Sequence, residues 1–263
     1  MLVAGVDVGA ATAKTVIMLD GKVAGQAVIP TGDRIVVAAE NVTRLALEKA
    51  GMWRDGFNFE DGFDYVISTG YGRHGVPFAN KAVTEIICHA QGAHFLLPAT
   101  RTIIDIGGQD SKAIGLDENG NVINFVMNDK CAAGTGRFLE VMAEVLGVTI
   151  DELGPIALKS HIPCQISSTC TIFAESEVVS LRAEGQLRED LIAGIVRAVS
   201  HRVAVMAKTV GFKREVAFTG GVAKNIGVKK ALEDEINIEI IVPEQPQTMG
   251  ALGAALLAKA EQG

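Results

Sequence analysis

The sequence lacks the long apolar run that a membrane-spanning helix needs. Its 263 residues contain no uninterrupted stretch of about 18 apolar side chains, so we expect no membrane span. Residues 1–14 carry Asp7 and Lys14 inside their apolar stretch and have no basic segment before it. We therefore expect no signal peptide and a cytoplasmic protein.

Positive charge is also in short supply. Lys and Arg number 24 against 31 Asp and Glu, which gives a formal net charge of −7. Because binding to a phosphate backbone depends on a basic surface, a nucleic-acid partner is not expected.

Two common nucleotide motifs are missing. No GxxxxGK[ST] segment occurs, which excludes a Walker A protein, and no GxGxxG segment follows a predicted strand, which disfavours a Rossmann site. Cysteine is scarce at four residues, which in a cytoplasmic chain indicates thiols or metal ligands. Glycine is abundant at 29 residues, gathered in short loops, which is typical of backbone that approaches a ligand closely.

The order of the elements predicts a duplicated α/β protein. Strands and helices interleave, and an opening of three strands and a helix recurs after Pro98. We expect an N-terminal half over 1–98, a C-terminal half over 99–248, and a last helix within 249–263 that packs back on the first half. Strands are expected over 2–9, 13–19, 22–29, 63–68, 102–106, 111–116, 122–127, 216–219 and 238–242. Helices are expected over 35–50, 81–97, 134–147, 149–158, 172–185, 189–210, 222–235 and 249–259.

The first candidate phosphate loop joins the first two predicted strands, and the chain turns there through small residues. Small side chains let backbone N–H groups reach a phosphate. The Thr12 hydroxyl can add a hydrogen bond, and Lys14 can add a positive charge. Asp7 is expected near a Mg²⁺ ion and linked to it through water, since that ion keeps most of its hydration. An ordinary hairpin turn is the alternative. The candidate binding residues are Gly9, Ala10, Ala11, Thr12, Ala13 and Lys14.

The second loop repeats this design in the second half, over residues 104–112 (IDIGGQDSK). Asp105 would help to hold the metal, and Gln109 or Asp110 would orient the attacking water. Two acid-plus-glycine loops at matching positions could close on a triphosphate from opposite sides. The glycines expected at the phosphates are Gly107 and Gly108.

A third glycine pair, Gly220 and Gly221, ends a predicted strand and can approach a flat adenine or ribose face. The small residues of 249–255 follow, and we interpret them as structural or hinge-related. The order of these four elements resembles the acetate and sugar kinase/Hsp70/actin superfamily over nearly the whole chain. That resemblance implies an actin-like (ribonuclease H-like) ATPase fold with a nucleotide cleft between two halves.

Two cysteines, Cys131 and Cys170, each precede a predicted helix, where the helix dipole favours a thiolate. A cubane iron–sulfur cluster needs four thiolates, so two copies of the chain could supply them across a dimer axis. Free buried cysteines are one alternative. Another is an intrachain zinc site on His161, Cys164 and Cys170.

The segments NDKCAAGTGRF and SSTCTIFAESEV, set between DIGGQD and TGGVAKN, resemble the ATP-dependent activators of 2-hydroxyacyl-CoA dehydratases. The wider family includes ATPase subunits of benzoyl-CoA reductases and reductases of double-cubane-cluster proteins. The resemblance implies a homodimer that shares one 4Fe–4S cluster, with Cys131 and Cys170 of both copies as ligands. It also implies ATP and ADP binding by residues 10–14, by the two glycine pairs, and by Lys224 and Gln247.

From this resemblance we form the hypothesis of a one-electron pump. A ferredoxin or flavodoxin would reduce the shared cluster, and ATP hydrolysis would change the cluster's environment so that an electron passes to a partner iron–sulfur enzyme. Three other functions stay open. They are an ATPase component of a benzoyl-CoA reductase or double-cubane system, a sugar or acyl kinase, and a non-catalytic sensor or chaperone-like ATPase. An oxygen-labile, iron-containing dimer would favour the pump.

Overall fold

The computed structural model describes residues 1–167 and 170–262, which form two compact units. Unit 1 comprises Met1–Thr100, Leu116–Ile123 and the described residues from Pro243 onward. Unit 2 comprises Arg101–Gly115 and Asn124–Val242 in its described part.

Unit 1 is built on a five-stranded sheet with the order β3-β2-β1-β4-β5. The first three strands are antiparallel neighbours, whereas β4 runs parallel to β1 and β5 parallel to β4. The strands are β1 (Leu2–Val8), β2 (Thr12–Leu19), β3 (Lys22–Pro30), β4 (Tyr65–Thr69) and β5 (Lys81–Ala82). The helices are α1 (Ile35–Lys49), α2 (Glu85–Leu96) and α8 (Met249–Ala260), with short 3₁₀ turns at Arg73–Gly75 and Pro246–Thr248.

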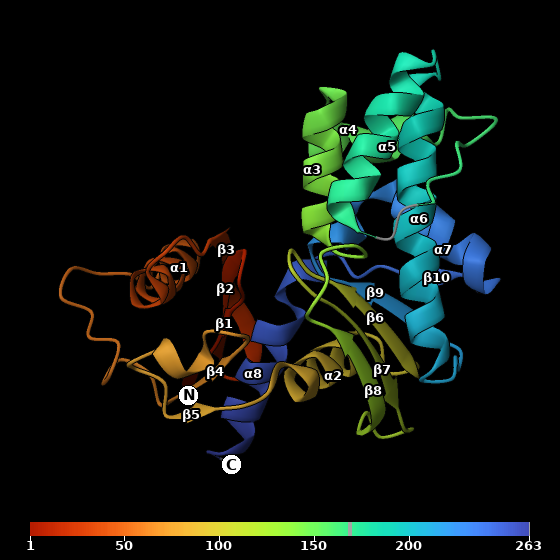
Figure 1. The fold of residues 1–263 in the computed structure, drawn as a ribbon. Coiled ribbons are helices and arrows are strands. Elements are labelled where there is room, and N and C mark those ends of the chain that lie inside the picture. Colours follow the sequence, from red (N-terminus) through yellow and green to blue (C-terminus); the bar gives the residue numbers. More distant parts are fainter. Residues whose placement is uncertain (168–169, 263) are drawn as a thin grey trace. The chain divides into compact units, whose positions relative to one another are not determined.

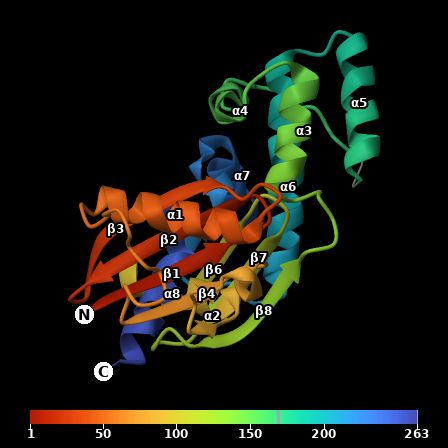
Figure 2. The same cartoon turned by 90° about the vertical axis from the view of Figure 1, so that its left-hand side faces the viewer.

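The alternation of side chains along β1 divides the core of unit 1 into two layers. Ala4, Val6 and Val8 belong to the cluster that includes α1, while Val3 belongs to the cluster that includes α8. Figure 2 shows α1 lying along the strands, in keeping with its contacts to β2 and β3. Asp7 shares the parity of Val3, which turns its side chain toward α8.

Unit 2 repeats this sheet with the order β10-β9-β6-β7-β8. Its strands are β6 (Thr102–Ile106), β7 (Ser111–Leu116), β8 (Val122–Asn128), β9 (Val216–Thr219) and β10 (Ile240–Ile241). Its helices are α3 (Gly136–Leu146), α4 (Ile150–Ala157), α5 (Thr171–Ala183), α6 (Arg188–Lys208) and α7 (Ile226–Ile236), with a 3₁₀ turn at Gly221–Lys224. One large apolar cluster joins β6, β7 and β9 to these helices, and Figure 1 shows α3 beside α5.

The two sheets have one topology, because β6, β7, β8, β9 and β10 take the places of β1, β2, β3, β4 and β5. In each, the first strand pairs antiparallel with the second and parallel with the fourth. The duplication predicted from the sequence is therefore present, and the α/β class is confirmed.

Two predicted helices begin later than expected. Residues 81–82 pair with β4 as β5, so tertiary pairing replaces helix there and α2 starts at Glu85. Residues 221–224 form a 3₁₀ turn, and α7 starts at Ile226 because the Asn225 side chain accepts the Val228 N–H at 3.0 Å as an N-cap. In the described part of the chain, no helix combines the length and the apolarity that a bilayer crossing requires.

Candidate functional site

The first hairpin places an acid and a lysine side by side. In the β1–β2 ladder Asp7 is the register partner of Lys14, and Lys14 Nζ lies 3.4 Å from Asp7 Oδ2. The Gly9 N–H donates to the Thr12 carbonyl at 3.0 Å and closes the turn. Residues 10–11 at the tip are exposed, so the turn presents backbone rather than bulky side chains to solvent.

Glycines surround the Asp7 carboxylate. Thr69 of β4 is its parallel register partner, and Gly70 follows with φ of +85°, where a Cβ would overlap Asp7 Oδ1. A Cβ on Gly250, at the start of α8, would stand 3.0 Å from Asp7 Oδ2 and 3.1 Å from His89 Nε2. Glycine at these two positions therefore leaves the room that the carboxylate occupies.

The second hairpin contains the same pair with more partners. Asp105 is the register partner of Lys112, and their side chains are each 3% exposed with Lys112 Nζ 3.3 Å from Asp105 Oδ2. Lys112 Nζ also lies 2.8 Å from Asp110 Oδ2. The Thr219 hydroxyl donates to Asp105 Oδ1 at 2.9 Å. Both oxygens of Asp105 are thus engaged by the chain's own donors.

A Thr-Gly pair completes each site. Gly220 follows Thr219 with φ of +87°, and a Cβ there would overlap the Ile106 carbonyl and stand 3.0 Å from Asp105 Oδ1. The same four residue types therefore occupy matching places in both units, namely Asp7, Lys14, Thr69 and Gly70 in unit 1 and Asp105, Lys112, Thr219 and Gly220 in unit 2. Thr69, Gly70, Lys112 and Thr219 were not singled out from the sequence. The Thr-Gly step at the end of a strand in each half is the signal that identifies them.

The second loop also holds the start of α3. The Gly136 N–H donates to the Gly107 carbonyl at 2.8 Å, and the Arg137 N–H donates to the Gly108 carbonyl at 2.7 Å. The first N–H groups of a helix have no partner within it, so this loop supplies their acceptors. A shift of residues 107–108 would therefore be felt at the beginning of α3.

The other expected nucleotide residues lie in both units. Gln109, Gly221 and Lys224 are exposed on unit 2, whereas Gly220 is buried beside Asp105. Gln247 is half-buried in the 3₁₀ turn before α8 of unit 1, and Ala13 is buried in β2.

Asn128 shapes the loop that carries Cys131. Its Oδ1 accepts the Cys131 N–H at 3.2 Å, and its Nδ2 donates to the carbonyls of Cys131 and Ala133 at 2.9 and 3.3 Å. The Thr135 hydroxyl donates to the Ala132 carbonyl at 2.6 Å. The half-buried Cys131 therefore sits in a hydrogen-bonded loop that leads directly into α3.

Cys170 is exposed at the N-cap of α5, and its carbonyl accepts the Ala174 N–H at 2.9 Å. The next residues present large apolar side chains to solvent, since Ile172 is 71% and Phe173 is 69% exposed. Two large apolar side chains next to the thiol are thus open to solvent.

The remaining cysteines are less suited to bind metal. Burial raises the pKa of the Cys88 thiol to about 12. Burial, with the Asp190 charge, also raises the pKa of Cys164. Among residues 1–167 and 170–262, no three His, Cys, Asp or Glu side chains gather closely enough to hold a metal ion. The zinc alternative on His161, Cys164 and Cys170 is therefore not formed.

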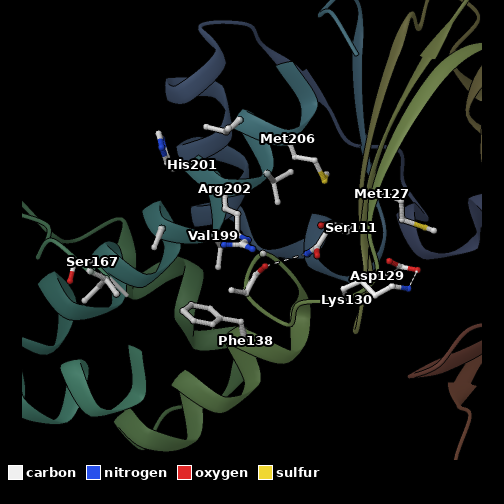
Figure 3. A pocket seen from close by; sticks show the side chains of 17 residues that line it. Ser111, Met127, Asp129, Lys130, Phe138, Ser167, Val199, His201, Arg202 and Met206 are labelled. Atoms are coloured by element: carbon white, nitrogen blue, oxygen red, sulfur yellow. Dashed lines mark hydrogen bonds and ion pairs between the residues drawn. The ribbon is translucent and has the colours of Figure 1, made fainter. Parts of the chain in front are cut away.

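A cavity of about 560 Å³ lies beside the Cys131 loop, within unit 2. Asp129, Lys130 and Gly134 line it from that loop. Phe138 and Arg202 line it from α3 and α6, and Figure 3 shows these two side chains with those of Asp129 and Lys130. The Arg202 stem packs on Gly134, whose φ is +92°.

Comparison with known proteins shows that this chain is similar to ATPases that activate dehydratases. The activator of the 2-hydroxyisocaproyl-CoA dehydratase from Clostridium difficile, solved with bound ADPNP, matches with a TM-score of 0.91 and 46% identity over 99% of this chain and 95% of that one. The (R)-2-hydroxyglutaryl-CoA dehydratase activating ATPase of Acidaminococcus fermentans is 45% identical over 97% of this chain and 95% of its own length. One of the subunits of the benzoyl-CoA reductase of Thauera aromatica is 32% identical over 97% of this chain and 92% of its own length.

A ROK family glucokinase from Streptomyces griseus shares the fold with a TM-score of 0.58 at 14% identity, covering 100% of both chains. This match confirms the sugar-kinase-like fold and nothing finer. The resemblance to dehydratase activators drawn from the motifs is confirmed as well. The model of the BadF/BadG/BcrA/BcrD ATPase family matches residues 4–258, and the chain belongs to that family of ATPases.

Proposed function

We propose that this protein is an ATP-hydrolysing activator that transfers a low-potential electron to a partner 2-hydroxyacyl-CoA dehydratase. The observation that carries the proposal is the connection between the second phosphate loop and the Cys131 segment through the start of α3. Through these hydrogen bonds and the chain before α3, a movement of the second loop on nucleotide binding would reach the Cys131 thiol. The identities of 45–46% to dehydratase activators, against 32% to the benzoyl-CoA reductase component, support the dehydratase as partner.

In this proposal the two hairpins bind the phosphates of ATP. The first hairpin offers the exposed residues 10–11 at its tip and, in β2, the Lys14 side chain, which is 14% exposed. Asp7 fits a Mg²⁺ ion held through water. Its Oδ2 is 3.4 Å from Lys14, longer than a charge-assisted hydrogen bond, and carboxylate oxygen is a ligand that this ion accepts. Such an ion would neutralise phosphate charge, while Gly107, Gly108, Gly220 and Gly221 allow the nucleotide close to the backbone.

The cysteines fit a 4Fe–4S cluster shared between two copies of the chain. A cubane cluster needs four thiolates, and each chain has two cysteines, Cys131 and Cys170, at segments that lead into helices. The exposed side chains of Ile172 and Phe173 would be covered in such a homodimer. A cluster held there would supply a one-electron centre whose potential responds to solvent exposure and nearby dipoles. Asn128 and the first turns of α3 and α5 would fix the positions of the four sulfurs.

We further propose a ferredoxin or flavodoxin as the electron donor, since a single low-potential electron has to reach each dimer. Binding of ATP at residues 107–108 would shift the carbonyls that cap α3, and α3 would move the Cys131 loop. Hydrolysis of ATP to ADP and phosphate would reset this position.

Anaerobic purification tests the proposal. We expect a homodimer by light scattering, with about four irons and four sulfides per two chains. Cys131→Ser and Cys170→Ser should each lose the iron, whereas the matched control Cys164→Ser should keep it. An iron-free monomer that hydrolyses ATP would leave an ATPase without the redox function.

A further inference from the structure

Lys112 is placed between the two carboxylates of the second hairpin. Its ammonium is 2.8 Å from Asp110 Oδ2 and 3.3 Å from Asp105 Oδ2, and the Lys112 side chain is 3% exposed. We infer that Lys112 is a positioning residue for ATP hydrolysis, which holds Asp110 where that carboxylate can align the attacking water. The inference rests on the ATPase activity and is independent of the iron–sulfur cluster.

Asp110 is the acid of this group that can reach a substrate. Its side chain is 30% exposed against 3% for Asp105. Its Oδ1 lies 2.5 Å from the place that a Cβ on Gly107 would take, and its carbonyl accepts the Gly107 N–H at 2.9 Å. The carboxylate therefore lies over the glycine turn that is expected to face the phosphates, with Oδ2 on Lys112 and Oδ1 beside Gly107.

The buried anchor makes this position well defined. The Thr219 hydroxyl donates to Asp105 at 2.9 Å, Asp105 holds Lys112, and Lys112 holds Asp110. Charged groups in a water-poor interior interact more strongly than at the surface, and a connected network restricts each member. Asp110, which directly precedes β7, is consequently held to the β6–β7 strand pair through Lys112.

A direct phosphate contact is the competing role for this lysine. Lys14, its counterpart in the first hairpin, has the accessibility for such a contact at 14% exposed. Lys112 is almost fully enclosed, and its amine already contacts two carboxylates. The competing role would raise the KM for ATP, whereas a positioning role would lower kcat.

A double-mutant cycle distinguishes these roles. Steady-state ATP hydrolysis is measured for the purified dimer carrying Lys112→Gln, Asp110→Asn, or both. We expect Asp110→Asn to lower kcat about a hundredfold and Lys112→Gln to lower it at least about tenfold, with the KM for ATP unchanged. The double variant should be no slower than Asp110→Asn alone. If the two losses multiply, or if Lys112→Gln raises the KM and leaves kcat unchanged, the inference is wrong.

Lys112→Gln leaves Asp105 without its cation and could unfold the unit. The same cycle is then measured with Lys112→Arg, which keeps a positive charge beside Asp105, and the same non-additivity with Asp110→Asn is expected. Lys230→Gln, on the exposed face of α7, is the control that should leave kcat and KM unchanged. A wild-type protein that hydrolyses no ATP would contradict the proposed function, while multiplicative losses in an active protein contradict the role of Lys112 alone.

Discussion

The two hairpins share a design but differ in how their charges are occupied. Both pair an aspartate with a lysine across the ladder and both border a Thr-Gly step. In unit 1 the Lys14 contact is long and partly accessible, whereas in unit 2 Lys112 is enclosed by two carboxylates. Duplication therefore gave two copies of one scaffold, in which the lysine of the first is partly accessible and the lysine of the second is enclosed between two acids.

The cysteines near the two hairpins also differ in their accessibility. The thiol near the first hairpin, Cys88, is fully buried, and the Asp7 charge contributes to its raised pKa. The second hairpin is linked through α3 to the more accessible Cys131 segment. The thiol near the first hairpin is thus enclosed, whereas the second hairpin is hydrogen-bonded to the start of α3, which follows a segment with a more accessible thiol.

The largest expected difference is in the reactivity of the thiols Cys88 and Cys170. Because the thiolate is the reactive form and the pKa of Cys88 is about 12, iodoacetamide at pH 8 should label Cys88 at least about a hundredfold more slowly than Cys170 in iron-free protein. Peptide mass spectrometry over a time course measures both rates. Comparable rates would mean that the first hairpin region opens readily.

Removal of Lys112 should lower the free energy of unfolding more than removal of Lys14. Lys112→Ala removes the cation from the buried Asp105, which keeps its hydrogen bond from Thr219, and should cost about 3–5 kcal/mol. Lys14→Ala should cost only about 1–2 kcal/mol, since its contact is longer and water can reach the site. Urea unfolding of nucleotide-free protein gives both values, and equal costs would break the comparison.

The affinity for ATP should instead fall more when Lys14 is replaced than when Lys112 is replaced. Lys14→Gln removes a cation from the phosphates, so ATP should bind about 10- to 100-fold more weakly, as expected for a hydrogen bond to a charged group. Lys112→Gln should leave the affinity within about twofold of wild type. Titration with a fluorescent ATP analogue measures both, and weaker binding in both variants would assign both lysines to the phosphates.

The smallest difference between the two units is expected at their Thr-Gly steps. Gly70→Ala and Gly220→Ala each place a side chain at positive φ, which alone costs about 1–2 kcal/mol, and in each case the new Cβ also overlaps a backbone carbonyl and crowds an aspartate. We expect similar decreases in thermal stability for both variants by circular dichroism. A decrease in only one of them would show that the Thr-Gly steps are not equivalent.

Local sequence patterns predicted the two hairpins but not the contacts that their aspartates and lysines make with the rest of each unit. Glycine, acid and lysine lie close in sequence in each loop, so the loops and the duplication were visible in the chain itself. Thr69 and Thr219 come from distant strands, and only the sheet order brings them to the aspartates. The enclosure of Lys112 depends on packing of the whole unit, which no short motif encodes. The roles of Cys131 and Cys170 stay predictions.

We propose that nucleotide bound at the second hairpin alters a 4Fe–4S cluster held by Cys131 and Cys170 of two chains. This is tested by electron paramagnetic resonance of the anaerobic, dithionite-reduced protein with ADP and with ATP. We expect a signal of a reduced 4Fe–4S cluster, one per two chains, whose shape changes between the two nucleotides. A signal that is identical in both states, or no signal from fully folded protein, would contradict it.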